Sequence, residues 1–168
     1  MRLSGRGGQL AWWAPDPRGV LPLDGFHVSR SLHKSRRKFT VTVDMEFEAV
    51  IGLCGDPRRP HGWITQDFVT AYVRMHELGW AHSFEVWQDD DLVGGMYGLR
   101  IKRFFAGESM FSHKTDASKI ALWAATELLR SDGVELFDVQ WSTDHLASLG
   151  AIEVSCDEYL QRLRGALR

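Results

Sequence analysis

The chain has 168 residues, of which 44% are apolar and 25% are charged, and its formal net charge is −2. These values predict one folded domain and exclude an intrinsically disordered chain, and no run of about 18 apolar residues could cross a bilayer. The two cysteines, Cys54 and Cys156, stand too far apart for a CxxC pair, so we expect no disulfide framework, no zinc site and a reducing cytoplasm as the compartment.

The first 62 residues predict a polar tail followed by short elements. Residues 1–10 are polar and glycine-rich, which predicts disorder. Residues 11–62 are expected to form an N-terminal segment that packs on the remaining domain. Its elements are a short strand at 20–23, a basic helix at 29–38 capped by Ser29, a strand at 39–43 and a helix at 46–54.

The charge of this segment is uneven. Residues 25–43 contain no Asp or Glu and hold five of the 20 basic residues, which are Arg30, Lys34, Arg36, Arg37 and Lys38. A basic segment on an otherwise acidic chain indicates an anionic partner that docks at one place. A solvated helix face would give the same pattern, so charge alone leaves both interpretations open.

Residues 63–168 predict the element order of an acyltransferase. A helix runs from the cap Thr65 to the stop signal Gly79, and the extended segments after it are separated by turns short enough for antiparallel hairpins. A long helix from Asp116 or Ser118, a buried strand and two capped helices follow. This order resembles the N-acetyltransferase (GNAT) fold. The expected class is therefore mixed α/β (α+β), with a mostly antiparallel sheet flanked by helices.

Several catalytic motifs are absent. A zinc-binding HExxH motif starting at His76 would need a second histidine where Trp80 stands, so we expect no metal site. His76 is expected to pack at a helix end, and His82 to lie in a loop. The glycines of residues 94–98 do not match GxGxxG, and the chain has neither a P-loop nor a GxSxG nucleophile elbow.

The stretch before the long helix argues against coenzyme A. Acetyl-CoA enzymes of this fold hold the pyrophosphate on a glycine-rich loop there, whereas residues 109–118 are expected to form a loop and contain no glycine. We therefore expect another acyl donor and no cofactor. A CoA-dependent N-acyltransferase remains the alternative enzyme, and an RNA-binding protein without catalysis is the alternative from another class.

Eight stretches, in order along the chain, resemble the leucyl/phenylalanyl-tRNA–protein transferases. They are WWAPDPRGVLPLDGFHVSRSL (12–32), WIT (63–65), AYVRMHELGWAHSFEVWQ (71–88), LVGGMYG (92–98), GESMFS (107–112), DASK (116–119), DVQ (138–140) and HLASLGA (145–151). The resemblance implies a bacterial cytoplasmic enzyme that takes Leu or Phe, and Met less well, from aminoacyl-tRNA. It implies transfer to the α-amine of proteins that begin with Arg or Lys, which marks them for N-degron degradation. We expect the enzyme to be a monomer.

The resemblance also assigns binding roles. The basic residues of 29–38 would hold the tRNA backbone, a largely sequence-independent and salt-sensitive contact. Trp12, Trp13 and Trp63 would stack near the tRNA 3′ end, although packing on the core is the alternative. The other four tryptophans are expected to be structural. The pocket for the aminoacyl side chain would include Met96, Phe105, Leu122, Ala125 and Phe137, for which plain core packing is the alternative.

Three polar residues are expected to carry the chemistry, which is aminolysis of an ester by a neutral amine. Asp138 and Gln140 stand two residues apart on the expected strand 134–140, so both should face one side, and Glu108 lies near the neighbouring strand. The resemblance implies that Gln140 contacts the amine, that Asp138 polarises Gln140 and takes the proton, and that Glu108 anchors the donor's amino group. Alternatively, water and the leaving ribose hydroxyl handle the proton, or the three residues form a structural polar network.

Members of this family usually carry a small domain upstream of the Trp-Trp motif. Here about ten residues precede that motif, so the expectation is a short form that lacks most of the upstream domain. Part of the wall around the tRNA 3′ end would then be missing. A catalytically impaired form that still binds tRNA is therefore a further alternative.

Overall fold

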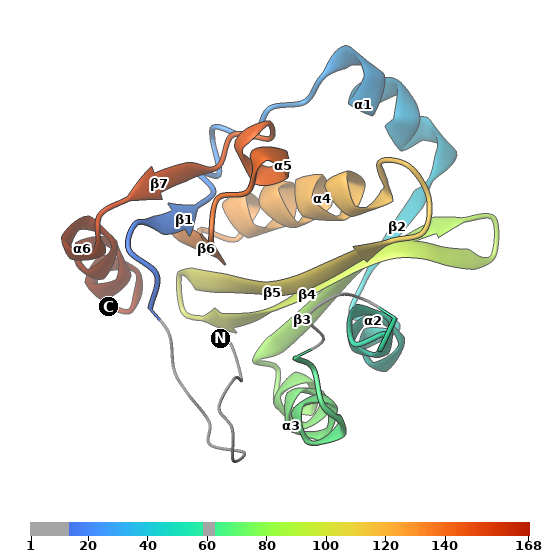
Figure 1. The fold of residues 1–168 in the computed structure, drawn as a ribbon, viewed down its shortest axis with the longest axis horizontal. Coiled ribbons are helices and arrows are strands. Elements are labelled where there is room, and N and C mark those ends of the chain that lie inside the picture. The colour runs from blue at the N-terminus through green and yellow to red at the C-terminus, as the bar shows by residue number, and fades with distance from the viewer. Residues whose placement is uncertain (1–13, 59–62) are drawn as a thin grey trace.

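The computed structural model describes residues 14–58 and 63–168, which form one seven-stranded sheet in the order β2-β3-β4-β5-β6-β1-β7 (Figure 1). The strands are β1 (Arg18–Val20), β2 (Thr40–Val43), β3 (Ala81–Gln88), β4 (Asp91–Ile101), β5 (Phe104–Ser112), β6 (Leu136–Gln140) and β7 (Ile152–Val154). β5 and β6 run parallel, and the other neighbouring strands pair antiparallel. This confirms the mixed, mostly antiparallel sheet.

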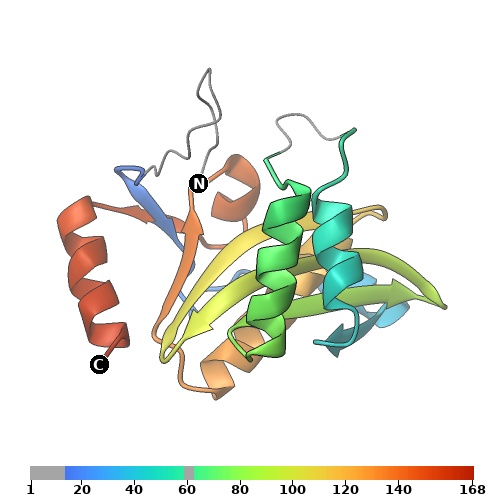
Figure 2. The same cartoon turned by 90° about the horizontal axis from the view of Figure 1, so that it is seen from below.

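Helices cover both faces of the sheet. They are α1 (Arg30–Ser35) with the 3-10 turn η1 (Arg36–Lys38), α2 (Phe47–Cys54), α3 (Gln66–Glu77), α4 (Ala117–Ser131), α5 (Asp144–Ala147) and α6 (Cys156–Ala166). α4 lies on one face, and α2 and α3 lie on the other (Figures 1 and 2). Within the described ranges, no helix is long and apolar enough to span a bilayer.

The strands alternate between two cores. On β4, Met96 belongs to the core under α4, whereas Tyr97 belongs to the core under α2 and α3. A third, smaller core forms where α6 packs on β6, β1 and β7. β1 and β2, which come from residues 11–62, lie in the same sheet as the strands of residues 63–168.

Side-chain caps set the starts of four helices. The side chains of Ser29, Thr65, Thr143 and Ser155 each accept a hydrogen bond from a backbone N–H of the first helical turn, as their positions in the sequence predict. Asp116 precedes α4 in a left-handed conformation, with φ 70°, and makes no side-chain cap. The helix starts predicted from these four hydroxyl residues are therefore confirmed. Of the two expected starts of the long helix, Asp116 precedes α4, whereas Ser118 lies inside it.

Three expectations about local structure differ from the fold. The first strand is Arg18–Val20 and not 20–23, because these residues bridge β6 and β7. β7 has only three residues, too short for an alternating pattern, and is absent from the expected elements. His82 lies within β3 and not in a loop, and its ring pairs with Asp44 at 2.7 Å.

The connection between β5 and α4 is shorter than the sequence indicates. β5 runs as far as Ser112, so most of residues 109–112 are strand, and only residues 113–116 connect it to α4. The expected glycine-free loop at 109–118 is therefore wrong in its extent. The remaining short connection also contains no glycine.

β5 and β6 diverge, and this divergence positions the site. Their parallel pairing ends at Ala106 and Asp138, after which β5 continues while β6 ends at Gln140. β5 also contains a bulge, because Ser109 and Gly107 pair with consecutive residues of β4. Glu108 is the extra residue of this bulge. Bulges commonly redirect a side chain beside a functional site.

Candidate active site

A cavity of about 170 Å³ lies where β5 and β6 diverge. Its lining is mostly apolar and contains one carboxyl group. The lining residues are Met96, Gly107, Glu108, Ser109, Met110, Leu122, Phe137, Val139 and Leu146. An apolar cavity of about 150 Å³ holds a molecule of benzene, so this space fits an aromatic ring or a branched aliphatic side chain.

Three of the five residues expected for an apolar pocket line this cavity: Met96, Leu122 and Phe137. Phe105 and Ala125 are buried in the same core as these three but do not line the cavity. The ring of Phe105 packs edge-on against Phe137, with centroids 5.1 Å apart. Phe105 therefore supports the cavity wall without lining it.

Glu108 joins the cavity to a polar cluster on the opposite face of the sheet. Gln140 Nε2 donates to Glu108 Oε2 at 3.3 Å, and the hydroxyl of Tyr72, from α3, is also hydrogen-bonded to Glu108. Burial raises the pKa of Glu108, and the charge of Asp138 acts in the same direction. The hydrogen bonds from Tyr72 and Gln140 oppose that rise without cancelling it.

Gln140 ends β6 in a left-handed conformation, with φ 67°. Non-glycine residues rarely adopt this conformation, which persists only where surrounding contacts impose it. Its backbone N–H donates to Asp138 Oδ1 at 2.8 Å, and its Nε2 also lies 3.5 Å from the carbonyl oxygen of Gly107. Phe137 can therefore line the cavity while Gln140 approaches Glu108 from the end of the strand.

Asp138 is buried behind Gln140 and does not line the cavity. Arg18 donates to both of its carboxylate oxygens, from Nε at 2.9 Å and from Nη2 at 2.6 Å. The Tyr159 hydroxyl donates to Oδ2 at 2.7 Å. The family resemblance implies that Asp138 polarises the side chain of Gln140, whereas the hydrogen bond found between them uses the backbone N–H of Gln140.

The basic segment of α1 and η1 is anchored by its apolar side. Leu32 is buried in the core, and the ring of His33 lies 5.8 Å from that of Trp123 on α4. Arg36 is half-buried and donates to the carbonyl of Phe39 at 3.2 Å. The other four expected tRNA-backbone residues are exposed: Arg30, Lys34, Arg37 and Lys38.

The tryptophans differ in their burial and in their internal contacts. Trp63 is half-buried and packs edge-on against Phe68, with centroids 5.0 Å apart, whereas Trp12 and Trp13 lie outside the described residues. Two of the four expected structural tryptophans make internal hydrogen bonds, Trp87 to Thr42 and Trp123 to Glu127. The other two, Trp80 and Trp141, are about half exposed, so a buried structural role does not describe them.

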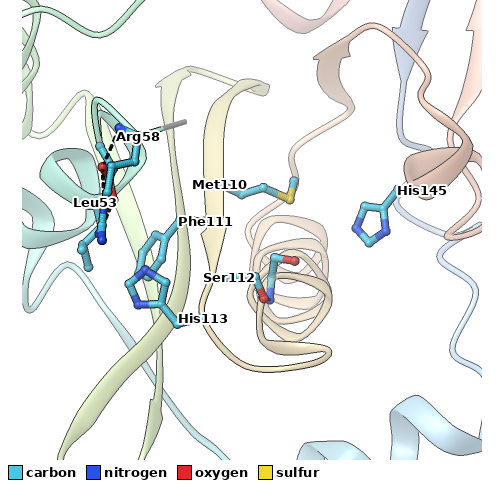
Figure 3. Close-up of a pocket in the computed structure, with 9 residues that line it drawn as sticks. Leu53, Arg58, Met110, Phe111, Ser112, His113 and His145 are labelled. Carbon is cyan, nitrogen blue, oxygen red and sulfur yellow. Dashed lines mark hydrogen bonds and ion pairs between the residues drawn. The ribbon is translucent and has the colours of Figure 1, made fainter. Parts of the chain in front are cut away.

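A second, larger cavity of about 650 Å³ adjoins the first, and Met110 lines both. Figure 3 shows Leu53 and Arg58 on one side of it and His145 on the other, with Met110 and Ser112 between them. This cavity reaches the start of α4 at Ser118. The two cavities together provide a small apolar recess beside a wider space, which both apolar side chains such as Leu53 and Phe111 and polar ones such as Arg58 line.

Sequence reasoning misses several residues around these cavities. Tyr72 carries the signal of an apolar helix face, and Tyr159 stands in a helix whose other apolar residues, such as Leu163 and Ala166, indicate packing only. Arg18 and Met110 fall within quoted motifs, but nothing in their spacing predicts their contacts. Among the residues that the structure describes, no group of His, Cys, Asp and Glu is arranged to hold a metal ion.

The meander, the long helix and the diverging parallel strands define the GCN5-related N-acetyltransferase fold. A solved N-acetyltransferase of that type from Kribbella flavida matches 84% of this chain and 55% of its own, with TM-score 0.51 and 12% identity. A protein of unknown function from Bacteroides thetaiotaomicron matches 80% of this chain and 53% of its own, with TM-score 0.52 and 9% identity. At such identities the likeness concerns the fold alone.

Sequence comparison identifies the family. Residues 20–164 match the model of the leucyl/phenylalanyl-tRNA protein transferases, and the chain belongs to this family. Proteins named leucyl/phenylalanyl-tRNA–protein transferase from Pseudoalteromonas atlantica and Cereibacter sphaeroides are each 50% identical over 95% of this chain. The one from Zymomonas mobilis is 48% identical over the same share. The chain covers 70%, 74% and 61% of these three proteins, respectively.

Proposed function

We propose that the chain transfers leucine or phenylalanine, and methionine less well, from aminoacyl-tRNA to the N-terminal α-amine of proteins that begin with Arg or Lys. The modified proteins would then enter N-degron degradation. One observation carries the proposal: the 170 Å³ apolar cavity has a carboxyl group, Glu108, on its lining and the amide of Gln140 3.3 Å from that group. The relatives named as leucyl/phenylalanyl-tRNA–protein transferases supply the reaction class.

The cavity would select the donor amino acid by size. Its walls include two methionines, Met96 and Met110, whose unbranched side chains adapt to either a branched aliphatic group or a ring. Phe137 and Leu146 complete the apolar part of the lining, on which Glu108 is the one charged group among the described residues. A charged donor side chain would lose hydration against these apolar walls, and an acidic one would also be repelled by Glu108. Leucine, phenylalanine and methionine satisfy these limits.

The reaction would form a C–N bond and break the ester C–O bond. The neutral α-amine attacks the ester carbonyl, the ribose 3′ oxygen leaves with a proton, and the amine loses one proton. Gln140 would orient the amine through its side-chain carbonyl. Glu108 would take the proton, because it lines the cavity and its raised pKa makes it a stronger base than an ordinary carboxylate.

Asp138 is a weaker candidate for the proton acceptor. Its two oxygens already accept hydrogen bonds from Arg18, Tyr159 and the backbone of Gln140. It also lies outside the lining of the cavity. The geometry therefore favours a supporting role for Asp138 and a direct role for Glu108.

The basic segment of α1 and η1 would hold the tRNA backbone. It lies above the start of α4 (Figure 1), and a hydrogen bond joins Ser35 of α1 to Asp116 at that helix start. The segment that carries the exposed side chains of Arg30, Lys34, Arg37 and Lys38 is thereby held beside the helix start that the larger cavity reaches. A tRNA 3′ end in the cavities would run out toward these cations.

The start of α4 disfavours coenzyme A as the donor. The hydrogen bond from Lys119 lowers the pKa of Asp116, so this residue is negatively charged at neutral pH. A pyrophosphate bound at the helix N-terminus would meet that charge, where GNAT enzymes offer backbone amides.

The proposal is tested by transfer of labelled phenylalanine from Phe-tRNA to a peptide beginning with Arg. Transfer should require a free α-amine, so the N-acetylated peptide is the matched control. A peptide beginning with Asp tests the preference for a cationic acceptor. Labelled acetyl-CoA in place of Phe-tRNA should give no product. Acetyl transfer without aminoacyl transfer would instead establish the CoA-dependent alternative, and tRNA binding without transfer would establish an impaired form.

A further inference from the structure

Gln140 adopts its left-handed conformation in direct contact with the carboxylate of Asp138. That carboxylate accepts the Gln140 backbone N–H at 2.8 Å, a side-chain-to-backbone bond across two residues. The conformation ends β6 and turns the Gln140 amide toward Glu108 at 3.3 Å. The groups that fix this carboxylate therefore bear on the position of the Gln140 amide.

Two side chains from distant parts of the chain fix it. Arg18, on β1, binds both oxygens of Asp138 in the bidentate geometry that holds a carboxylate in one orientation. Tyr159, on α6, donates its hydroxyl to Oδ2, and its ring lies under the guanidinium of Arg18 at 5.1 Å. Asp138 is 1% exposed, so a carboxylate there needs this cation and these donors.

The carboxylate of Asp138 raises the pKa of both Arg18 and Tyr159, so each keeps the proton that it donates. Burial alone lowers the pKa of Arg18, but the hydrogen bonds and charge of Asp138 outweigh burial, and the net shift is upward. Burial raises the pKa of Tyr159, and the charge of Asp138 raises it further, so the hydroxyl remains a donor at neutral pH. Neither side chain lines the 170 Å³ cavity.

We infer that Arg18 and Tyr159 are positioning residues for the transfer reaction: they lock Asp138, and Asp138 in turn holds Gln140 in the conformation that presents its amide to Glu108 and the attacking amine. This inference rests on the proposed function for its reaction. Arg18 lies on β1, Tyr159 on α6 and Asp138 on β6. The position of the Gln140 side-chain amide therefore depends on three elements that come together only in the folded chain.

The kinetic test compares Arg18→Lys and Tyr159→Phe with wild type in Phe transfer to the Arg peptide. Lys keeps the charge but loses the bidentate contact, and Phe removes only one oxygen while it keeps the ring under Arg18. We expect kcat to fall between about 10- and 100-fold for Arg18→Lys, as for other misplaced catalytic groups. The fall should be smaller for Tyr159→Phe, and KM for Phe-tRNA should stay unchanged in both. Arg103→Lys is the matched control, because Arg103 contacts Glu135 and the Gly165 carbonyl of α6, away from the cavity.

Two further measurements separate positioning from general stability. Guanidinium ion should restore part of the activity of Arg18→Ala, since it can re-form the contact with Asp138. The backbone amide proton of Gln140, observed by NMR in the free enzyme, should shift upfield in Arg18→Lys as its hydrogen bond weakens, and should stay in place in Arg103→Lys. An unchanged kcat or an unmoved Gln140 amide in Arg18→Lys would overturn the inference. Absence of transfer by wild type would instead overturn the proposed function, and the NMR result would still decide the positioning.

Discussion

At the scale of single residues, the carboxyl group of Glu108 lies where burial disfavours its charged form. Burial raises the pKa of its carboxyl group above the unfolded value of about 4.3. The folded protein therefore binds this proton more tightly than the unfolded chain does. It follows that the Glu108 contribution to the free energy of unfolding decreases as the pH rises from the unfolded pKa through the folded pKa. The burial that makes Glu108 a stronger base therefore also lowers the free energy of unfolding once Glu108 is charged.

Glu108→Gln separates the two effects. The amide can still bond to Tyr72 and Gln140 but takes no proton, so we expect transfer to fall by about 100-fold. The free energy of unfolding at pH 7 should rise by about 1 kcal/mol, as when other strained functional groups are replaced. Urea denaturation between pH 4 and pH 8 measures this, with exposed Glu153 changed to Gln as the control. If Glu108→Gln kept the pH dependence of wild type, Glu108 would titrate alike in the folded and unfolded chain.

At the scale of elements, the sequence predicts regular segments well and irregular ones poorly. Hydroxyl caps such as Ser29 and Thr65 locate helices because their signal is local. The bulge at Glu108 has no local signal, since it depends on pairing with β4. The left-handed Gln140 has none either, because the carboxylate of Asp138 that binds its backbone is itself held by Arg18 and Tyr159 from distant elements. The roles expected for Glu108 and Gln140 come from a family resemblance. The contacts of Arg18 and Tyr159 with Asp138 emerge only from the three-dimensional structure.

The basic segment of α1 and η1 offers a prediction at this scale. Replacing the exposed Lys34, Arg37 and Lys38 by Ala should weaken tRNA binding. The slope of the logarithm of the binding constant against the logarithm of the salt concentration should become less steep by about two to three. Arg36 is left intact, because its hydrogen bond to Phe39 supports the fold of the segment. Fluorescence anisotropy with labelled tRNA from 50 to 300 mM salt measures the slope.

A matched triple variant controls for net charge. Ala at Arg74, Arg162 and Arg164 removes the same charge from α3 and α6. This variant should bind tRNA with the wild-type slope. Equal slopes in the two triple variants would show that long-range attraction, and not docking on α1 and η1, governs binding.

At the scale of the whole molecule, one sheet joins the two ends of the described chain. β1 lies between β6, which carries Asp138 and Gln140, and β7, which leads into α6. Gly19 makes this arrangement possible, because a Cβ there would lie 2.6 Å from the backbone carbon of Trp141. The close approach of β1 to the chain that follows β6 therefore requires glycine at this position.

Gly19→Ala should accordingly destabilise the protein by about 1–3 kcal/mol, since backbone atoms must move to admit the methyl group. Gly52→Ala is the matched control: Gly52 lies within α2 with nothing within 4 Å of the added Cβ, and alanine should stabilise that helix by about 0.5–1 kcal/mol. Urea denaturation followed by tryptophan fluorescence and by circular dichroism measures both variants. Coincident single transitions are expected because β1, β6 and β7 share one sheet with β2–β5. An early, separate fluorescence transition in Gly19→Ala would show that the edge formed by β1 and β7 unfolds independently, and the contacts of Arg18 and Tyr159 with Asp138 would then be lost before the rest of the sheet.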